Sequence, residues 1–232
     1  MIGITWLGHG TFELQLETGE VYVLDPWING NPAYPAGYKV RRADAVIVTH
    51  GHFDHIHDAV PLATRHNATA VGIFEICKWL DKKGVKKTSP MNKGGTQQVG
   101  PVKITMVHAV HSCGILDGDE IIYGGEAAGY VLELPDTRRI YFAGDTNVFS
   151  DMALIRELYQ PKLAMLPIGD LFTMGPREAA LASRLVKPEL VIPMHFGTFP
   201  PLTGRPEQLS ELLVNVPGTK VWPLEPGVCV EW

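Results

Sequence analysis

Short apolar runs separated by turns with glycine or proline recur along the whole amino-acid sequence. The first of these runs predict a meander of strands over 2–7, 12–16 and 21–24. Runs of similar length and character predict further strands over 45–49, 70–73, 102–107, 130–134, 139–143, 163–166, 190–192, 221–224 and 228–230. The chain is therefore expected to be rich in strands.

Longer segments between these strands carry apolar residues at helical spacing. They predict helices over 58–66, 75–83, 152–159, 176–186 and 206–214. Two helix ends are marked, because Gly84 follows the helix over 75–83 and Pro176 opens the helix over 176–186. Strands and helices occur in both β-rich halves, roughly 1–125 and 126–232, so the pattern predicts a mixed α/β fold in a single domain over 1–232.

Two stretches show neither periodicity. Residues 27–42 place Trp27, Tyr34 and Tyr38 among prolines and glycines, which is compatible with an ordered loop or with an aromatic-lined lid. Residues 112–129 are rich in glycine and are expected to form a long loop or a hairpin.

Composition narrows the class of protein. The chain has 232 residues, of which 45% are hydrophobic and 19% charged, as in an ordinary globular protein. A net charge of -5 argues against broad nucleic-acid binding, and no apolar run reaches the roughly 20 residues that span a bilayer. The three cysteines form no C-x-x-C pair, and the first residues do not resemble a signal peptide. We therefore expect a cytoplasmic protein; a homo-oligomer is compatible with this composition.

The densest chemical signal is the stretch from His50 to His55, which directly follows the apolar run over 45–49. Its three histidines and one aspartate offer imidazole nitrogens and a carboxylate, the ligands that zinc and similar divalent ions prefer. The alternative is a solvated polar turn. Three of the nine histidines within six residues, immediately after a buried strand, favour the metal site.

Further histidine and aspartate residues occur where later strands are predicted to end. The candidate ligands are His50, His52, Asp54, His55, His111, Asp145 and His195. Seven ligands are too many for one tetrahedral ion. They suit two ions that share a bridging carboxylate and a bridging water.

The H-x-H-x-D-H stretch resembles the signature of the metallo-β-lactamase superfamily. The chain also has, in that family's order, the motifs Asp25-Pro26, His111, Gly144-Asp145-Thr146 and Pro193-Met194-His195-Phe196-Gly197. The opening residues 6–12 resemble the branch that contains the ascorbate-6-phosphate lactonase and many metal-dependent hydrolases. The resemblance covers nearly the whole chain and implies a four-layer αββα sandwich.

The resemblance also implies a role for each candidate ligand. It assigns His50, His52 and His111 to a first metal ion, Asp54, His55 and His195 to a second, and Asp145 to a bridging position. The two divalent ions, with zinc favoured over manganese or iron, would hold a bridging hydroxide that attacks a lactone or another ester or amide. Asp54 would be the catalytic residue that accepts a proton from this nucleophile.

Several alternatives remain at this point. A metal-dependent phosphodiesterase or nuclease, a metal-binding scaffold without turnover, and an oxidoreductase would use similar ligands. His52 disfavours the oxidoreductase, because the oxygen-reducing diiron branch has glutamate at this position.

His108 is the alternative to His111 as the metal ligand that follows the strand over 102–107. If it is not the ligand, His108 is expected in the core or beside the ligands. His9 is expected either to face the substrate or to be structural, and Asp25 to orient backbone or a ligand histidine.

Overall fold

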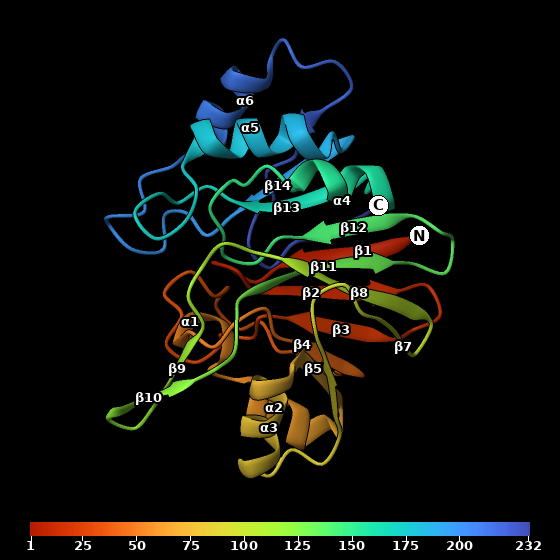
Figure 1. The fold of residues 1–232 in the computed structure, drawn as a ribbon, viewed down its shortest axis with the longest axis vertical. Helices are drawn as coiled ribbons and strands as arrows, with labels where there is room; N and C mark the ends of the chain where they lie inside the picture. The colour runs from red at the N-terminus through yellow and green to blue at the C-terminus, as the bar shows by residue number, and fades with distance from the viewer. The chain divides into compact units, whose positions relative to one another are not determined.

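The computed structural model describes residues 1–232 as two compact units that alternate along the chain. The first unit comprises 1–95, 112–127 and 225–232, and the second comprises 96–111 and 128–224. Each unit contains one seven-stranded sheet (Figure 1). The structure thus confirms the mixed α/β class.

The sheet of the first unit has the order β16-β1-β2-β3-β4-β5-β6. Its strands are β1 (Ile2–Trp6), β2 (Phe12–Leu16), β3 (Val21–Leu24), β4 (Ala45–Ile47), β5 (Thr69–Ile73), β6 (Thr88–Met91) and β16 (Cys229–Glu231). Strands β3 to β6 run parallel, and Leu24 pairs with Ile47. Because parallel strands end at the same edge of a sheet, Asp25 and the residues after β4 lie together there.

Three helices complete the main body of the first unit: α1 (Phe53–Ile56), α2 (Ala59–His66) and α3 (Phe74–Lys82). Helix α3 packs on β5 and β6 through the buried residues Ile76 and Leu80. The loop after β3 is ordered by Asp58, whose carboxylate accepts hydrogen bonds from the backbone N–H groups of Ile28 at 2.6 Å and Asn29 at 2.9 Å. The stretch over 27–42 is therefore a loop pinned at its start.

A separate two-stranded hairpin also belongs to the first unit. It pairs β9 (Gly114–Asp117) with β10 (Glu120–Tyr123) and projects from the rest of the unit at the lower left of Figure 1. Asp117 attaches the hairpin to α3, because its carboxylate accepts hydrogen bonds from Trp79 Nε1 at 2.9 Å and Lys83 Nζ at 2.6 Å. The sequence predicts either a long loop or a hairpin over 112–129, and the structure contains the hairpin.

The sheet of the second unit has the order β15-β14-β13-β12-β11-β8-β7. Its strands are β7 (Thr96–Val99), β8 (Val102–His108), β11 (Ala128–Glu133), β12 (Arg139–Phe142), β13 (Leu163–Pro167), β14 (Leu190–Met194) and β15 (Lys220–Val221). Strands β12 to β15 are parallel. Strand β8 is antiparallel to β11, which is antiparallel to β12, so β8, β12 and β14 all end at one edge.

Helices α4 (Met152–Tyr159), α5 (Pro176–Val186) and α6 (Pro206–Leu213) lie on this sheet, with α5 packed between α4 and α6. The small residues Ala179, Ala180 and Ala182 are buried on α5 and allow the close approach of its neighbours. Their apolar cluster, together with Tyr141 and Leu166 of the strands, is the core of the second unit.

Most predicted elements are present within a residue or two of their expected ends. The sequence pattern missed α1, β6 and β7. Strand β6 contains Pro90, which is tolerated because β6 is an edge strand, and β7 has a single apolar residue, Val99. The strand predicted over 221–224 is only Lys220–Val221. None of the helices combines the length and the apolar character that crossing a bilayer requires.

Candidate metal centre

The stretch from His50 to His55 forms a compact turn, hereafter the ligand turn, at the end of β4 in the first unit. His50 and His55 are buried, with ring centroids 4.2 Å apart, and His50 Nε2 lies 3.0 Å from His52 Nδ1. Helix α1 begins directly after His52 and therefore presents Asp54 and His55 on its first turn. The four predicted ligands of the first unit thus lie within one short segment.

The buried carboxylate of Asp25 supports this turn from the end of β3. Its Oδ1 accepts the backbone N–H of Thr49 at 2.7 Å, and its Oδ2 lies 2.6 Å from Thr49 Oγ1 and 2.7 Å from His55 Nδ1. Burial raises the pKa of Asp25, while His55 and Thr49 oppose that rise. Because Nδ1 of His55 faces Asp25, Nε2 is the ring nitrogen available to coordinate a metal ion.

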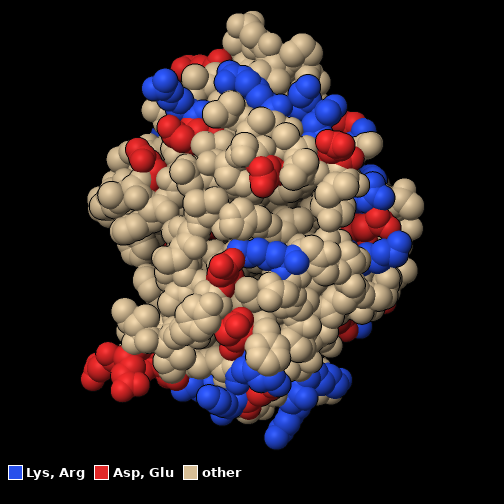
Figure 2. Space-filling model, in the orientation of Figure 1, with Lys and Arg blue, Asp and Glu red and all other residues tan.

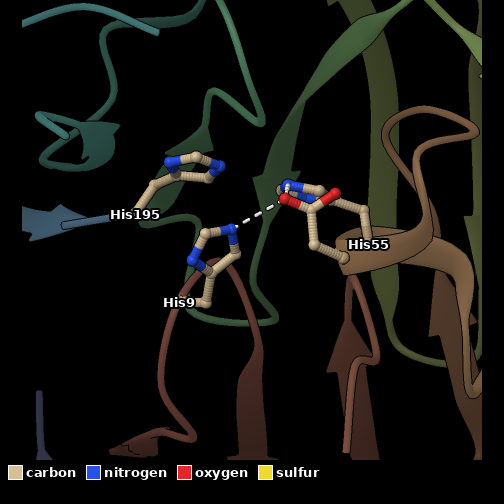
Figure 3. A group of neighbouring side chains, drawn as sticks. His9, His55 and His195 are labelled. Atoms are coloured by element: carbon tan, nitrogen blue, oxygen red, sulfur yellow. Dashed lines mark hydrogen bonds and ion pairs between the residues drawn. The ribbon is translucent and has the colours of Figure 1, made fainter. Parts of the chain in front are cut away.

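His9 lies in the turn between β1 and β2, beside the ligand turn (Figure 3). Its Nε2 is 2.9 Å from Asp54 Oδ2, the contact that the dashed line marks in the figure. The carbonyl oxygen of His9 accepts a hydrogen bond from Trp6 Nε1 at 2.9 Å, and the His9 ring meets Trp27 edge-on at 5.2 Å. His9 is therefore a buried, fixed neighbour of Asp54.

The second unit brings its three predicted ligands to one sheet edge. His111 follows β8, Asp145 follows β12 and His195 follows β14. The Oδ2 atom of Asp145 lies 3.1 Å from His195 Nε2 and 3.7 Å from His111 Nε2. One carboxylate oxygen thus faces two imidazoles.

Hydrogen bonds and close packing of neighbouring residues hold the segments that carry these three ligands. Thr146 Oγ1 accepts the N–H of Val110 at 3.0 Å, and the N–H of Asn147 donates to the Val110 carbonyl oxygen at 3.0 Å, which holds the segment before His111 against the end of β12. Gly169 approaches the backbone of His195 so closely that a Cβ at this position would overlap the His195 carbonyl oxygen. This contact requires glycine at position 169.

His108 is not among these residues. It is exposed at the end of β8, where its ring lies 5.1 Å from that of Phe149. The expectation that His108 would be a core residue is therefore wrong: it sits on the solvent-facing side of the strand, whereas His111 lies beyond the strand and next to Asp145.

Sequence reasoning missed two residues that hold the ligand turn. Thr49 binds both oxygens of Asp25, and Ser112 Oγ lies 3.1 Å from His52 Nε2. The position of Thr49, a hydroxyl residue immediately before a histidine cluster, is a sequence signal for its role. For Ser112 the only signal is its position next to His111, because Ser112 is far from His52 in the sequence.

The chemistry of these residues fits divalent metal ions. In the first unit, one potential ligand atom from each of Asp25, His50 and His55 lies within 4.8 Å of the others, and the same holds for His9, Asp54 and His55. Imidazole nitrogens and carboxylate oxygens in buried positions are ligands for zinc, manganese or iron.

Comparisons with known proteins agree with this chemistry. A family model described as a beta-lactamase superfamily domain matches residues 21–196, which include every predicted metal ligand. A metal-dependent hydrolase of Solibacter usitatus is 66% identical over 229 residues, covering 99% of this chain and 99% of that protein. A second one, of Methanopyrus kandleri, is 46% identical over 232 residues and covers 98% of this chain and 99% of its own length.

A solved structure extends the likeness to three dimensions. The metallo hydrolase of Ignicoccus hospitalis superposes with a TM-score of 0.87 and 34% sequence identity, covering 100% of this chain and 99% of that one. This match and the family model confirm the metallo-β-lactamase fold predicted from the sequence. The chain therefore belongs to the metallo-β-lactamase superfamily, among its metal-dependent hydrolases.

Proposed function

We propose that this hydrolase works with two divalent metal ions, with zinc favoured, and that Asp145 would be one of the residues that hold them. The observation that carries the proposal is the Oδ2 atom of Asp145, which lies 3.1 Å from His195 Nε2 and 3.7 Å from His111 Nε2. We assign four further donors to the ligand turn: His50, His52, Asp54 and His55. Seven donors exceed the needs of one tetrahedral ion.

When bound, such ions lower the pKa of a water molecule and polarise the oxygen of an ester or amide. The residues of this chain then have separate tasks. Asp25 fixes the ring of His55 through the 2.7 Å contact at Nδ1. His9 fixes the carboxylate of Asp54 through the 2.9 Å contact at Oδ2. Asp54 is the group we assign to accept the proton of the attacking water.

We propose a small-molecule substrate with a lactone or another ester or amide bond. A phosphodiester is the second candidate, because the same donor set serves displacement at phosphorus. The net charge of -5 favours small molecules over nucleic acids.

Metal analysis combined with an activity panel tests this proposal. The purified protein should contain zinc or manganese and hydrolyse lactones or simple esters. Turnover of phosphodiesters alone would reverse the order of the two substrate classes. Bound iron with redox cycling would favour an oxidoreductase, and a metal-loaded protein without any turnover would favour a scaffold.

The bridging role has its own variant. Asp145→Ala should lose at least one metal ion per chain, because this carboxylate faces both histidines of its unit. Asp136→Ala is the matched control, since Asp136 is exposed and paired only with Arg138. Unchanged metal stoichiometry in Asp145→Ala would remove Asp145 from the centre.

A further inference from the structure

A cavity of about 610 Å³ lies in the first unit. It is lined by strands β2 and β3, by the turn between them and by the segment over 37–42. Its volume falls within the range of roughly 300–1,000 Å³ that is usual for small-molecule sites. None of its lining residues is a candidate metal ligand or belongs to the ligand turn, so the metal centre does not account for this cavity.

Three basic residues of the segment over 37–42 line the cavity. Arg42 is already paired, because its Nε lies 2.8 Å from Asp44 Oδ2 and its Nη2 donates to Asp44 Oδ1 at 2.8 Å. Lys39 and Arg41 are exposed, and neither side chain forms an ion pair or a hydrogen bond with the protein. Two positive charges in the cavity are therefore uncompensated.

Many other basic residues of the chain are paired with carboxylates. Lys93 Nζ lies 2.7 Å from Glu126 Oε2, and Arg139 Nε lies 2.7 Å from Glu133 Oε2. On the face shown in Figure 2, blue and red side chains are accordingly interspersed. The cavity differs, because it gathers uncompensated positive charge on a chain whose net charge is -5. Such a hollow raises the local concentration of small anions.

The cavity also contains one carboxylate, that of Glu13 on β2. The hydroxyl of Tyr38 donates to its Oε1 at 2.8 Å and holds the side chain in place. Its Oε2 has no hydrogen-bond partner in the protein. A hydroxyl group of a ligand can donate to this oxygen, whereas an anionic group is repelled by it and attracted by Lys39 and Arg41.

We propose that this cavity binds a small phosphate monoester that carries a free hydroxyl group. A phosphate monoester has a charge of about −1.5 to −2 at pH 7, which matches the two uncompensated cations. Lys39 and Arg41 bind the phosphate oxygens, and Glu13 Oε2 accepts a hydrogen bond from the hydroxyl. A simple carboxylate would leave one of the two cations uncompensated. The site is independent of the metal centre proposed above.

NMR of the full, zinc-loaded chain tests the proposal, because it reports each backbone amide separately. With glycerol 3-phosphate, the amide signals of residues 37–42 should shift with a dissociation constant below about 1 mM. Inorganic phosphate has no carbon-bound hydroxyl and should bind there about fivefold more weakly, the effect of one hydrogen bond. Glycerol, which has no charge, should cause no shift at the same concentration. Shifts confined to residues beside the metal ligands, or no shift at 37–42, would overturn the proposal.

Substitution of the two cations tests their assignment. Lys39→Ala and Arg41→Ala should each raise the dissociation constant of glycerol 3-phosphate about tenfold, the effect of losing a hydrogen bond to a charged group. Lys82→Ala is the matched control, because Lys82 is exposed on α3 and does not line the cavity. Unchanged thermal midpoints would show that the variants are folded. Native affinity in both cavity variants, or equal affinities of the native protein for the two phosphates, would overturn the proposal.

Discussion

The Nδ1 atom of His55 lies 2.7 Å from Oδ2 of Asp25, a residue that precedes it by 30 positions. Asp25 also binds the backbone N–H and the hydroxyl of Thr49. One buried carboxylate therefore ties the end of β3 to the end of β4 and sets the orientation of a predicted metal ligand. In metal sites, such supporting contacts affect affinity without touching the ion.

The variant Asp25→Asn should weaken metal binding about 10–100-fold, the usual effect of losing a carboxylate behind a ligand histidine. The amide keeps the size of the side chain but loses its charge and one acceptor. Competition with a chromophoric chelator measures the affinity. Asp136→Asn serves as the control, and equal affinities of the two variants would contradict a supporting role for Asp25.

Asp58 should be important for the loop that follows β3. The variant Asp58→Ala removes the acceptor for the N–H groups of Ile28 and Asn29 and should lower the free energy of unfolding by about 1–3 kcal/mol. Urea unfolding gives this value, and limited proteolysis should cleave the 27–42 stretch faster. If Asp58→Ala unfolds and cleaves like the exposed control Asp151→Ala, the loop is held by other contacts.

Glu13 should make stability depend on pH. Burial raises the pKa of Glu13 above its ordinary 4.5, while the hydrogen bond from Tyr38, 2.8 Å long, lowers it. The folded state therefore holds this proton more tightly than the unfolded chain. The contribution of Glu13 to the free energy of unfolding is fully present below pH 4.5 and is lost as pH rises through the folded pKa.

The variant Glu13→Gln isolates this effect, because the neutral amide can still accept the Tyr38 hydroxyl but does not titrate. Across the window above pH 4.5, its unfolding free energy should fall less with pH than that of the native protein. Urea unfolding at several pH values gives both curves. If the two curves of unfolding free energy against pH are parallel, Glu13 does not contribute to the pH dependence of stability.

The three cysteines should differ in reactivity. Burial raises the pKa of Cys77 to about 12 and that of Cys113 to about 11, whereas Cys229 is exposed. Since the thiolate is the reactive form, iodoacetamide should label Cys229 alone in the native protein and all three after unfolding. Mass spectrometry locates the label. Rapid labelling of Cys113 in the native protein would contradict the prediction that Cys229 alone reacts. So would rapid labelling of the folded Cys229→Ser variant, which serves as the control.

Local patterns of the sequence predicted most of the strands and helices because burial on one face imposes a period. They also located the ligand turn, where four donors follow each other in the chain. The hairpin was less predictable, because it is held by contacts distant in sequence. Asp117 meets Trp79 and Lys83, and Ile115 meets Gly51.

The same limit applies around the metal ligands. A role for Asp25 in orienting backbone or a histidine was predicted, and the structure shows that it does both. The pairing of Ser112 with His52 and of His9 with Asp54 depends on how separate turns come together. The periodicity of hydrophobic residues within a segment does not predict such contacts between separate turns.

Within each unit, the strands that precede the candidate metal ligands end at one edge of their own sheet, which has a practical consequence for protein engineering. The turn between β2 and β3 and the turn between β11 and β12 lie at the opposite edges of their sheets, and residues 17, 18 and 135–137 are exposed there. Neither turn carries a metal donor. An affinity tag, a fluorescent label or new chain termini introduced at these turns should leave the donors in register.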